Sequence, residues 1–208
     1  MTWLVPLSLV VVGAAVAVWL LAGRRREKRD PRLDTLHQEA AAACEAGDPA
    51  AVDRLLARRA ELGLTEDEAA IEIEMLKGLR DFLAFRAEVE RGGLPVLDTQ
   101  HRVLGADRCH FWTPAFPPDQ VESSGKLFLT GTRLVFLGGG VQAAPWHAVS
   151  TITRDGRDLV AVVPSRGAVL RFRCNAYGEA MRALYVAERL LVANRARRAA
   201  PPGGPAPV

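Results

Sequence analysis

The sequence predicts an α+β protein with an N-terminal transmembrane helix, a helical segment, and an open β-barrel of about seven antiparallel strands capped by a C-terminal helix. Three observations lead to this fold class. An uncharged run, WLVPLSLVVVGAAVAVWLLA, comes near the start. Helical spacing and capping residues then dominate up to Gly92-Gly93, and beyond them apolar residues alternate with period two. The predicted divisions are a transmembrane helix (3–22), a basic juxtamembrane stub (24–32), an acidic helical segment (33–92), the barrel with its helix (94–197) and a disordered tail (198–208).

The uncharged run 3–22 has the length of a membrane span. A helix rises about 1.5 Å per residue, so this run covers roughly 30 Å, the thickness of a hydrocarbon core. The basic stub follows the run, and basic flanks stay on the cytoplasmic side. A cleaved signal peptide would carry its basic region before the apolar run. We therefore expect a single-pass inner-membrane protein with its N-terminus outside and its body in the cytoplasm.

Composition excludes several classes of protein. With 49% hydrophobic and 25% charged residues, the chain is neither collagen-like nor wholly disordered. The three cysteines are widely spaced without a Cys-x-x-Cys pair, which argues against a disulfide framework and for a reducing compartment. The abundance of Ala, Arg, Gly and Val favours a GC-rich bacterial source.

Charge is unevenly distributed along the chain. Residues 33–92 carry 7 basic and 14 acidic side chains, whereas residues 93–208 carry 14 basic and 8 acidic ones. The acidic segment therefore has three open interpretations: a spacer that packs between its neighbours, a surface for docking a protein, or a partner for the basic C-terminal half of the same chain.

The acidic segment shows the start and stop signals of three helices. Gly47 ends the first helix, predicted over 34–46, and Asp48-Pro49 starts the second, over 49–62. Thr65 and Glu68 match a capping box for the third, which runs to about Arg91. This third helix has two apolar rows, so we expect it to pack on two sides.

The pattern of the C-terminal half predicts short strands joined by tight turns. Strands are predicted over 108–113, 125–130, 133–137, 141–144, 149–154, 158–163 and 168–173, with Pro114 breaking the first. Asn175 is predicted to cap a helix over 176–195 with one apolar face, made of Tyr177, Met181, Leu184, Ala187 and Leu191. Trp112 and Trp146 could line a ligand groove, but in so small a barrel we expect them to fill or cap the core.

The stretch GKLFLTGTRLVFLGG resembles the GRAM/PH-like superfamily. That family's pattern is a glycine, a strand ending in Leu-Thr, two turn residues, then Arg-Leu and an apolar strand, which is matched by Gly125, Leu129, Thr130, Arg133, Leu134 and Phe136. The resemblance covers about residues 94–195 and implies a PH-type barrel, a fold that hosts lipid binding, peptide binding and scaffolding. Phosphoinositide-binding members carry a dense Lys/Arg cluster on the first hairpin, where this chain has only Lys126 and the motif residue Arg133.

No pattern in the sequence predicts catalysis. The histidines and cysteines lack metal-ligand spacing, and there is no Walker loop, dinucleotide fingerprint or nucleophile elbow. We expect no enzyme activity, no metal or other cofactor, and no nucleic-acid partner. The candidate binding residues are Lys126, Arg154, Arg157, Arg166, Arg171 and Arg173, with a solvated outer face as the alternative for the arginines. The predicted function is a membrane-tethered scaffold whose PH/GRAM-like domain engages a protein partner, or alternatively anionic lipid headgroups.

Overall fold

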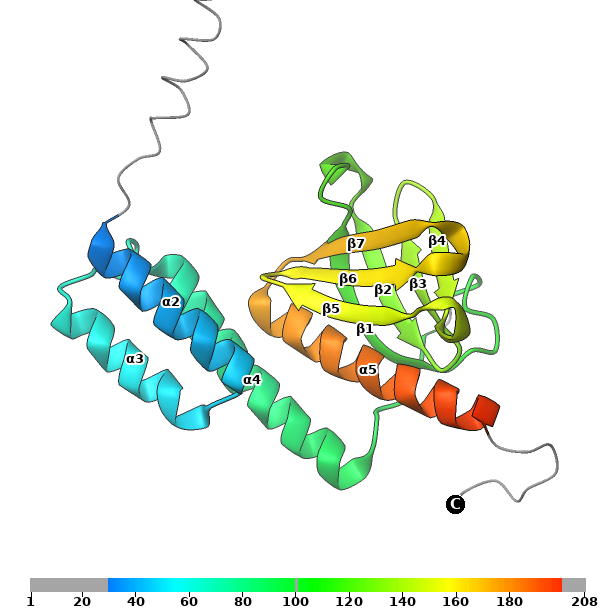
Figure 1. Ribbon diagram of the computed structural model, residues 1–208, viewed down its shortest axis with the longest axis horizontal. Coiled ribbons are helices and arrows are strands. Elements are labelled where there is room, and N and C mark those ends of the chain that lie inside the picture. Colours follow the sequence, from blue (N-terminus) through cyan, green and yellow to red (C-terminus); the bar gives the residue numbers. More distant parts are fainter. Residues whose placement is uncertain (1–29, 100, 200–208) are drawn as a thin grey trace, which may run out of the picture.

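The computed structural model describes residues 30–99 and 101–199 (Figure 1). Three helices come first and pack together as a helical unit: α2 (Pro31–Ala46), α3 (Pro49–Glu61) and α4 (Ala70–Gly92). Seven strands and a final helix form a barrel unit: β1 (Cys109–Phe116), β2 (Gly125–Thr130), β3 (Arg133–Leu137), β4 (Val141–Pro145), β5 (Thr151–Asp155), β6 (Asp158–Val163), β7 (Ala168–Cys174) and α5 (Tyr177–Ala199).

Local signals account for the helix ends. Asp48 Oδ1 accepts a hydrogen bond from Ala50 N at 2.9 Å, which caps α3 as predicted. Thr65 and Glu68 form their capping box, with Thr65 N donating to Glu68 Oε2 at 2.8 Å, although regular helix begins only at Ala70. Gly47 ends α2 with a left-handed φ of 63°, a conformation that glycine adopts without strain.

The strands form one antiparallel sheet in the order β4-β3-β2-β1-β7-β6-β5, which curls around a core while α5 lies alongside (Figure 1). The seven antiparallel strands and closing helix implied by the GRAM/PH-like resemblance are therefore confirmed. One strand differs from its prediction, because β1 continues through Pro114 to Phe116. Strand β7 pairs with β1 only at Ala115 and Phe116, so Pro114 lies where one side of β1 has no neighbouring strand.

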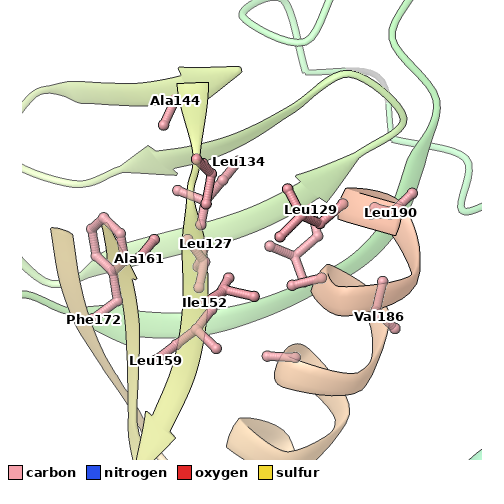
Figure 2. Packing of buried hydrophobic residues seen from close by; sticks show 14 of the residues in the cluster. Leu127, Leu129, Leu134, Ala144, Ile152, Leu159, Ala161, Phe172, Val186 and Leu190 are labelled. Carbon is pink, nitrogen blue, oxygen red and sulfur yellow. The ribbon is translucent and has the colours of Figure 1, made fainter. Parts of the chain in front are cut away.

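The barrel core is filled by alternate residues of the strands and by one side of α5. Leu127, Leu129 and Leu134 point inward from the first hairpin and meet Val186 and Leu190 of α5 (Figure 2). Trp146 is fully buried as predicted, and its Nε1 donates to the carbonyl oxygen of Thr130 at 2.7 Å. Burial of these apolar side chains supplies the main driving force for closing the barrel.

Helix α5 packs on two sides, whereas the sequence predicted one apolar face. Val186 and Ala187 belong to the barrel core, but Met181 belongs to the core of the helical unit. Helix α4 approaches so closely that a Cβ atom added at Gly78 would lie 2.6 Å from the backbone N of Gly178. The start of α5 is held by the same neighbour, since Tyr177 N donates to Glu74 Oε1 at 3.2 Å.

The two units meet without ion pairs. Aromatic rings of α4 and α5 stack edge to face, with Phe82 and Tyr185 centroids 5.8 Å apart. Each ion pair found in residues 30–99 and 101–199 joins two residues of the same unit. The acidic helices therefore dock on α5 through apolar and glycine contacts and the hydrogen bond from Tyr177 N to Glu74, rather than through ion pairs with the arginines of the strands.

The structure corrects the predicted fold class and localisation, both of which included a membrane-spanning helix. Within residues 30–99 and 101–199, no helix is both long and apolar enough to cross a membrane. The longest helices, α4 and α5, have 23 residues each, but charged side chains recur along both. The span predicted over 3–22 lies outside the described residues, as does the tail beyond Ala199, where α5 ends.

Candidate functional site

An apolar surface lies on the outer face of the first four strands. In each strand the residues that alternate with core residues point outward, and strand register aligns Pro114 with Lys126, Lys126 with Leu137, and Leu137 with Val141. Trp112 lies next to this row on β1 and is 40% exposed. We call Trp112, Pro114, Lys126, Leu137 and Val141 the outer-face patch.

A hollow of about 330 Å³ opens beside the patch, lined by Thr99, His101, Trp112, Lys126 and Phe128. The Nζ of Lys126 lies 4.7 Å from the centroid of the Trp112 ring, which is the distance of a cation–π contact. His101 and Phe128 also line the hollow, and the centroids of their rings lie 5.9 Å apart. The lining therefore combines three rings with the ammonium group of Lys126.

The segment that precedes β1 covers the rest of this face and is fixed by Asp107. Leu104 packs on Phe128 and Val135 from outside the sheet. Asp107 Oδ2 accepts hydrogen bonds from the hydroxyl groups of Thr130 and Thr132, at 2.7 and 2.5 Å. Two motif residues, Thr130 and Arg133, thus hold this segment, and Arg133 also donates to the carbonyl oxygen of Val103 at 3.1 Å.

The structure brings two of the predicted site residues together, on the outer face of β7. Arg171 Nε and Arg173 Nε each donate to the carboxylate of Asp158 at 2.6 Å, and Arg171 also contacts Asp155 at 2.6 Å. Asp158 is only 1% exposed. Burial by itself would raise the pKa of Asp158, but the hydrogen bonds and charges of Arg173 and Arg171 bring that pKa below its ordinary value.

The other four predicted cations do not bind Asp158 and lie on different elements: two beside the β5–β6 turn, one in the β6–β7 turn and one on β2. Arg154 and Arg157 flank the β5–β6 turn and donate to the carbonyl oxygens of Gly156 and Asn175, at 2.8 and 2.9 Å. Arg166 reaches from the β6–β7 turn to the carbonyl oxygen of Ala143 on β4, at 2.8 Å. Lys126 alone belongs to the outer-face patch. Five of the six residues therefore already donate to a carboxylate or to a backbone carbonyl oxygen.

The thiols and other potential ligands offer little chemistry. Cys44, Cys109 and Cys174 are buried, and burial raises the pKa of each thiol, that of Cys174 to about 12. In the part of the chain that the structure describes, no three His, Cys, Asp or Glu side chains lie close enough to hold a metal ion. The absence of enzyme activity and of a cofactor stays a prediction.

The sequence analysis misplaced one residue of the site, Trp112, and missed another, Asp107. Trp112 was expected to fill or cap the core, with the lining of a groove as the alternative. It points outward and lines the hollow, because Phe111 and Ala115 of the same strand point inward. A strict period-two reading of β1 would have found this, although an irregular register between Cys109 and Phe111 obscures the pattern. No sequence pattern pointed to Asp107, because only the folded hairpin brings its hydrogen-bond partners Thr130 and Thr132 close to it.

No family model matches the chain, and no curated protein is significantly similar to it. Among solved structures, the N-terminal PH domain of human ARAP2 is similar at 14% identity and a TM-score of 0.31, covering 47% of this chain and 90% of that one. The FERM and C-terminal domain complex of Drosophila Merlin gives 13% identity and a TM-score of 0.39, covering 70% of this chain and 43% of that one.

A third similar structure is the DH/PH fragment of PDZRHOGEF in complex with human RhoA, at 12% identity and a TM-score of 0.36, covering 82% of this chain and 57% of that one. The chain thus spans about half the length of the last two proteins. The PH-like arrangement of the barrel unit rests on its own strand order and closing helix.

Proposed function

We propose that this chain is a non-enzymatic binding protein whose barrel unit engages a protein partner through the outer-face patch. The observation that carries this proposal is an exposed tryptophan beside a lysine, both of which line an apolar hollow. Tryptophan is one of the residues that contribute most to protein–protein binding, especially where neighbouring apolar side chains exclude water. A partner would insert an apolar side chain beside Trp112 and place a carboxylate near Lys126.

The predicted alternative, binding of anionic headgroups by the basic face, has less support. A phosphate group is bound well where several unengaged cations converge on it. Here Arg171 and Arg173 share one buried carboxylate, and the guanidinium groups at the two turns donate to backbone carbonyl groups. We therefore keep a protein as the proposed partner.

Site-specific photo-crosslinking in the full-length chain tests the proposal. A photoreactive residue is placed at Val141, at the margin of the patch, or at Val169, on the outer face of β7; the two side chains are 61% and 62% exposed, which makes them matched positions. We expect a protein adduct from position 141 that is absent from position 169. Trp112→Ala and Lys126→Glu should each remove it.

The identified partner is then tested with purified full-length chain. Trp112→Ala should weaken its binding by at least about tenfold, the usual effect of truncating an energetically important interface residue. Equal adducts at both positions, or adducts that survive Trp112→Ala, would contradict the proposal. Lipid adducts in place of protein adducts would favour the headgroup alternative.

A further inference from the structure

Folding leaves opposite charges uncompensated in the two units. The acidic residues of 33–92 outnumber the basic ones by 14 to 7, and the basic residues of 93–208 outnumber the acidic ones by 14 to 8. The contact between α4 and α5 is made by glycine backbone and aromatic rings, and no described ion pair crosses it. Each unit therefore keeps its net charge available to another molecule.

The positive charge gathers where the end of α5 meets the β2–β3 turn. Asn194 Nδ2 and Arg197 Nη2 donate to the carbonyl oxygen of Gly131, at 3.0 and 3.4 Å, and Gly131 N donates to the carbonyl oxygen of Arg108 at 2.8 Å. Asp107, beside the same turn, is already engaged by two hydroxyl groups and Arg133. We define the basic end as four exposed arginines without a carboxylate partner among the described residues: Arg108, Arg195, Arg197 and Arg198. Two of them are partly engaged, because Arg195 donates to the carbonyl oxygen of Ser150 at 2.6 Å and Arg197 to that of Gly131.

The negative charge gathers around a hollow at the other end of α5. This hollow of about 480 Å³ lies between α4 and α5, and its lining contains five carboxylates and two cations: Glu66, Asp67, Glu74, Asp81, Glu179, Lys77 and Arg182. We call it the acidic hollow. The exposed side chains of Asp67 and Asp81 have no partner in the described part of the chain.

One carboxylate oxygen of the acidic hollow lacks a donor. Glu179 Oε2 is removed from solvent and accepts no hydrogen bond from any described residue. Burying such an acceptor unpaired is costly, and a charged donor relieves that cost most effectively. A guanidinium group from outside the molecule would instead reach the exposed carboxylates around this oxygen, Asp67 and Asp81, since it carries five N–H groups on a long side chain.

We propose that copies of this chain associate head to tail, with the basic end of one copy docked in the acidic hollow of the next. Helix α5 has 23 residues, with the acidic hollow at its first turns and the basic end at its last turns. From Glu179 in the hollow to Arg197 at the basic end is 18 residues, or roughly 27 Å at a rise of about 1.5 Å per residue, so one copy cannot satisfy its own hollow. Because the two surfaces differ, the contact is heterologous and can propagate from copy to copy. Neither the basic end nor the acidic hollow shares a residue with the outer-face patch.

Charge reversal in the full-length chain tests the proposal. Arg197→Glu/Arg198→Glu makes the basic end acidic, and Asp67→Lys/Asp81→Lys makes the hollow basic; all four side chains are exposed, so folding should be unaffected. The wild-type chain should associate at low salt and dissociate as salt rises. Each variant alone should associate at least about tenfold more weakly, because like charges then face each other.

Mixing the two variants is the decisive measurement. In the mixture both contacts again join opposite charges, so energy transfer between separately labelled variants should recover wild-type association. Lys126→Glu/Arg166→Glu is the matched control, since it makes the same charge change in the barrel unit away from the basic end and should leave association intact. The proposal is wrong if the wild-type chain does not self-associate at low salt, if salt has no effect, or if the mixture stays unassociated.

Discussion

Trp112 and Trp146 have opposite environments, although the sequence predicted a core position for both. Trp146 is fully buried and donates a hydrogen bond to Thr130, whereas Trp112 is 40% exposed on the outer face of β1. The two side chains are chemically identical, so the contrast separates a tryptophan that stabilises the fold from one that is available for binding.

Replacing each tryptophan with alanine should therefore have different effects on stability. Trp146→Ala should lower the free energy of unfolding by about 3–5 kcal/mol, because it opens a large cavity in the barrel core. Trp112→Ala should change it by less than about 1 kcal/mol, as is usual for surface substitutions. Urea unfolding followed by circular dichroism measures both values. Equal destabilisation by the two variants would mean that Trp112 is a core residue.

The buried carboxylate of Asp158 makes the stability of the fold depend on pH. Its pKa is held below the ordinary value by Arg173 and Arg171, despite the opposing effect of burial. A group with a lowered folded-state pKa stabilises the fold at pH values above its unfolded pKa, near about 4, and loses this contribution as pH falls through the folded pKa.

Asp158→Asn should lower the free energy of unfolding by about 2 kcal/mol at pH 7, since it leaves two arginines without their shared carboxylate. The difference from wild type should stay constant above about pH 5 and shrink below about pH 4. Urea titrations across this range measure it, with Asp119→Asn, at an exposed position, as control. A difference that grows toward acid pH would contradict this assignment.

Most elements were predictable because their ends carry local signals. Glycine and Asp-Pro mark the helix ends, and paired turn residues mark the hairpins, so six of the strands and all four described helices lie close to their predicted ranges. The predictions that were wrong concern tertiary contacts. One is the packing of α5 on two sides, and the other is the continuation of β1 through Pro114. Both depend on which elements lie alongside in the folded chain, and no local sequence pattern indicates those neighbours.

The contact between α4 and α5 depends on two glycines that have no Cβ atom. Gly78→Ala should lower the free energy of unfolding by about 1–3 kcal/mol through overpacking, even though alanine favours helix by about 1 kcal/mol. Gly92→Ala, at the end of the same helix with nothing within 4 Å of an added Cβ, should be neutral or slightly stabilising. Thermal unfolding of the two variants compares them, and a neutral Gly78→Ala would show that the helices can separate at little cost.

The two units should unfold together because α5 belongs to both cores. Cys44 reports on the helical unit and Cys174 on the barrel, and burial raises the pKa of both thiols, so each should react only after unfolding. Thiol labelling of the full-length chain at increasing urea concentrations should give coincident midpoints for the two cysteines. Earlier reaction of Cys44 would show that the helical unit opens independently.

The candidate site was less predictable than the fold. Counting charges singled out six cations, but a sequence does not show which of them find carboxylates or carbonyl oxygens after folding. Asp158 and the backbone of Gly156, Asn175 and Ala143 engage five of the six. The outer-face patch became visible only when the register placed Trp112, Lys126 and Val141 on one side of the sheet.

The double packing of α5 has a consequence for how this protein can diverge. The first half of α5 supplies side chains to both cores, such as Met181 to one and Ala183 to the other, so a shift of the helix that accommodates a substitution in one core disturbs the other. Outward-facing side chains on the edge strands β4 and β5 need not fit either of these two cores. Descendants of this chain should therefore preserve the opening turns of their last helix while the margins of the sheet drift.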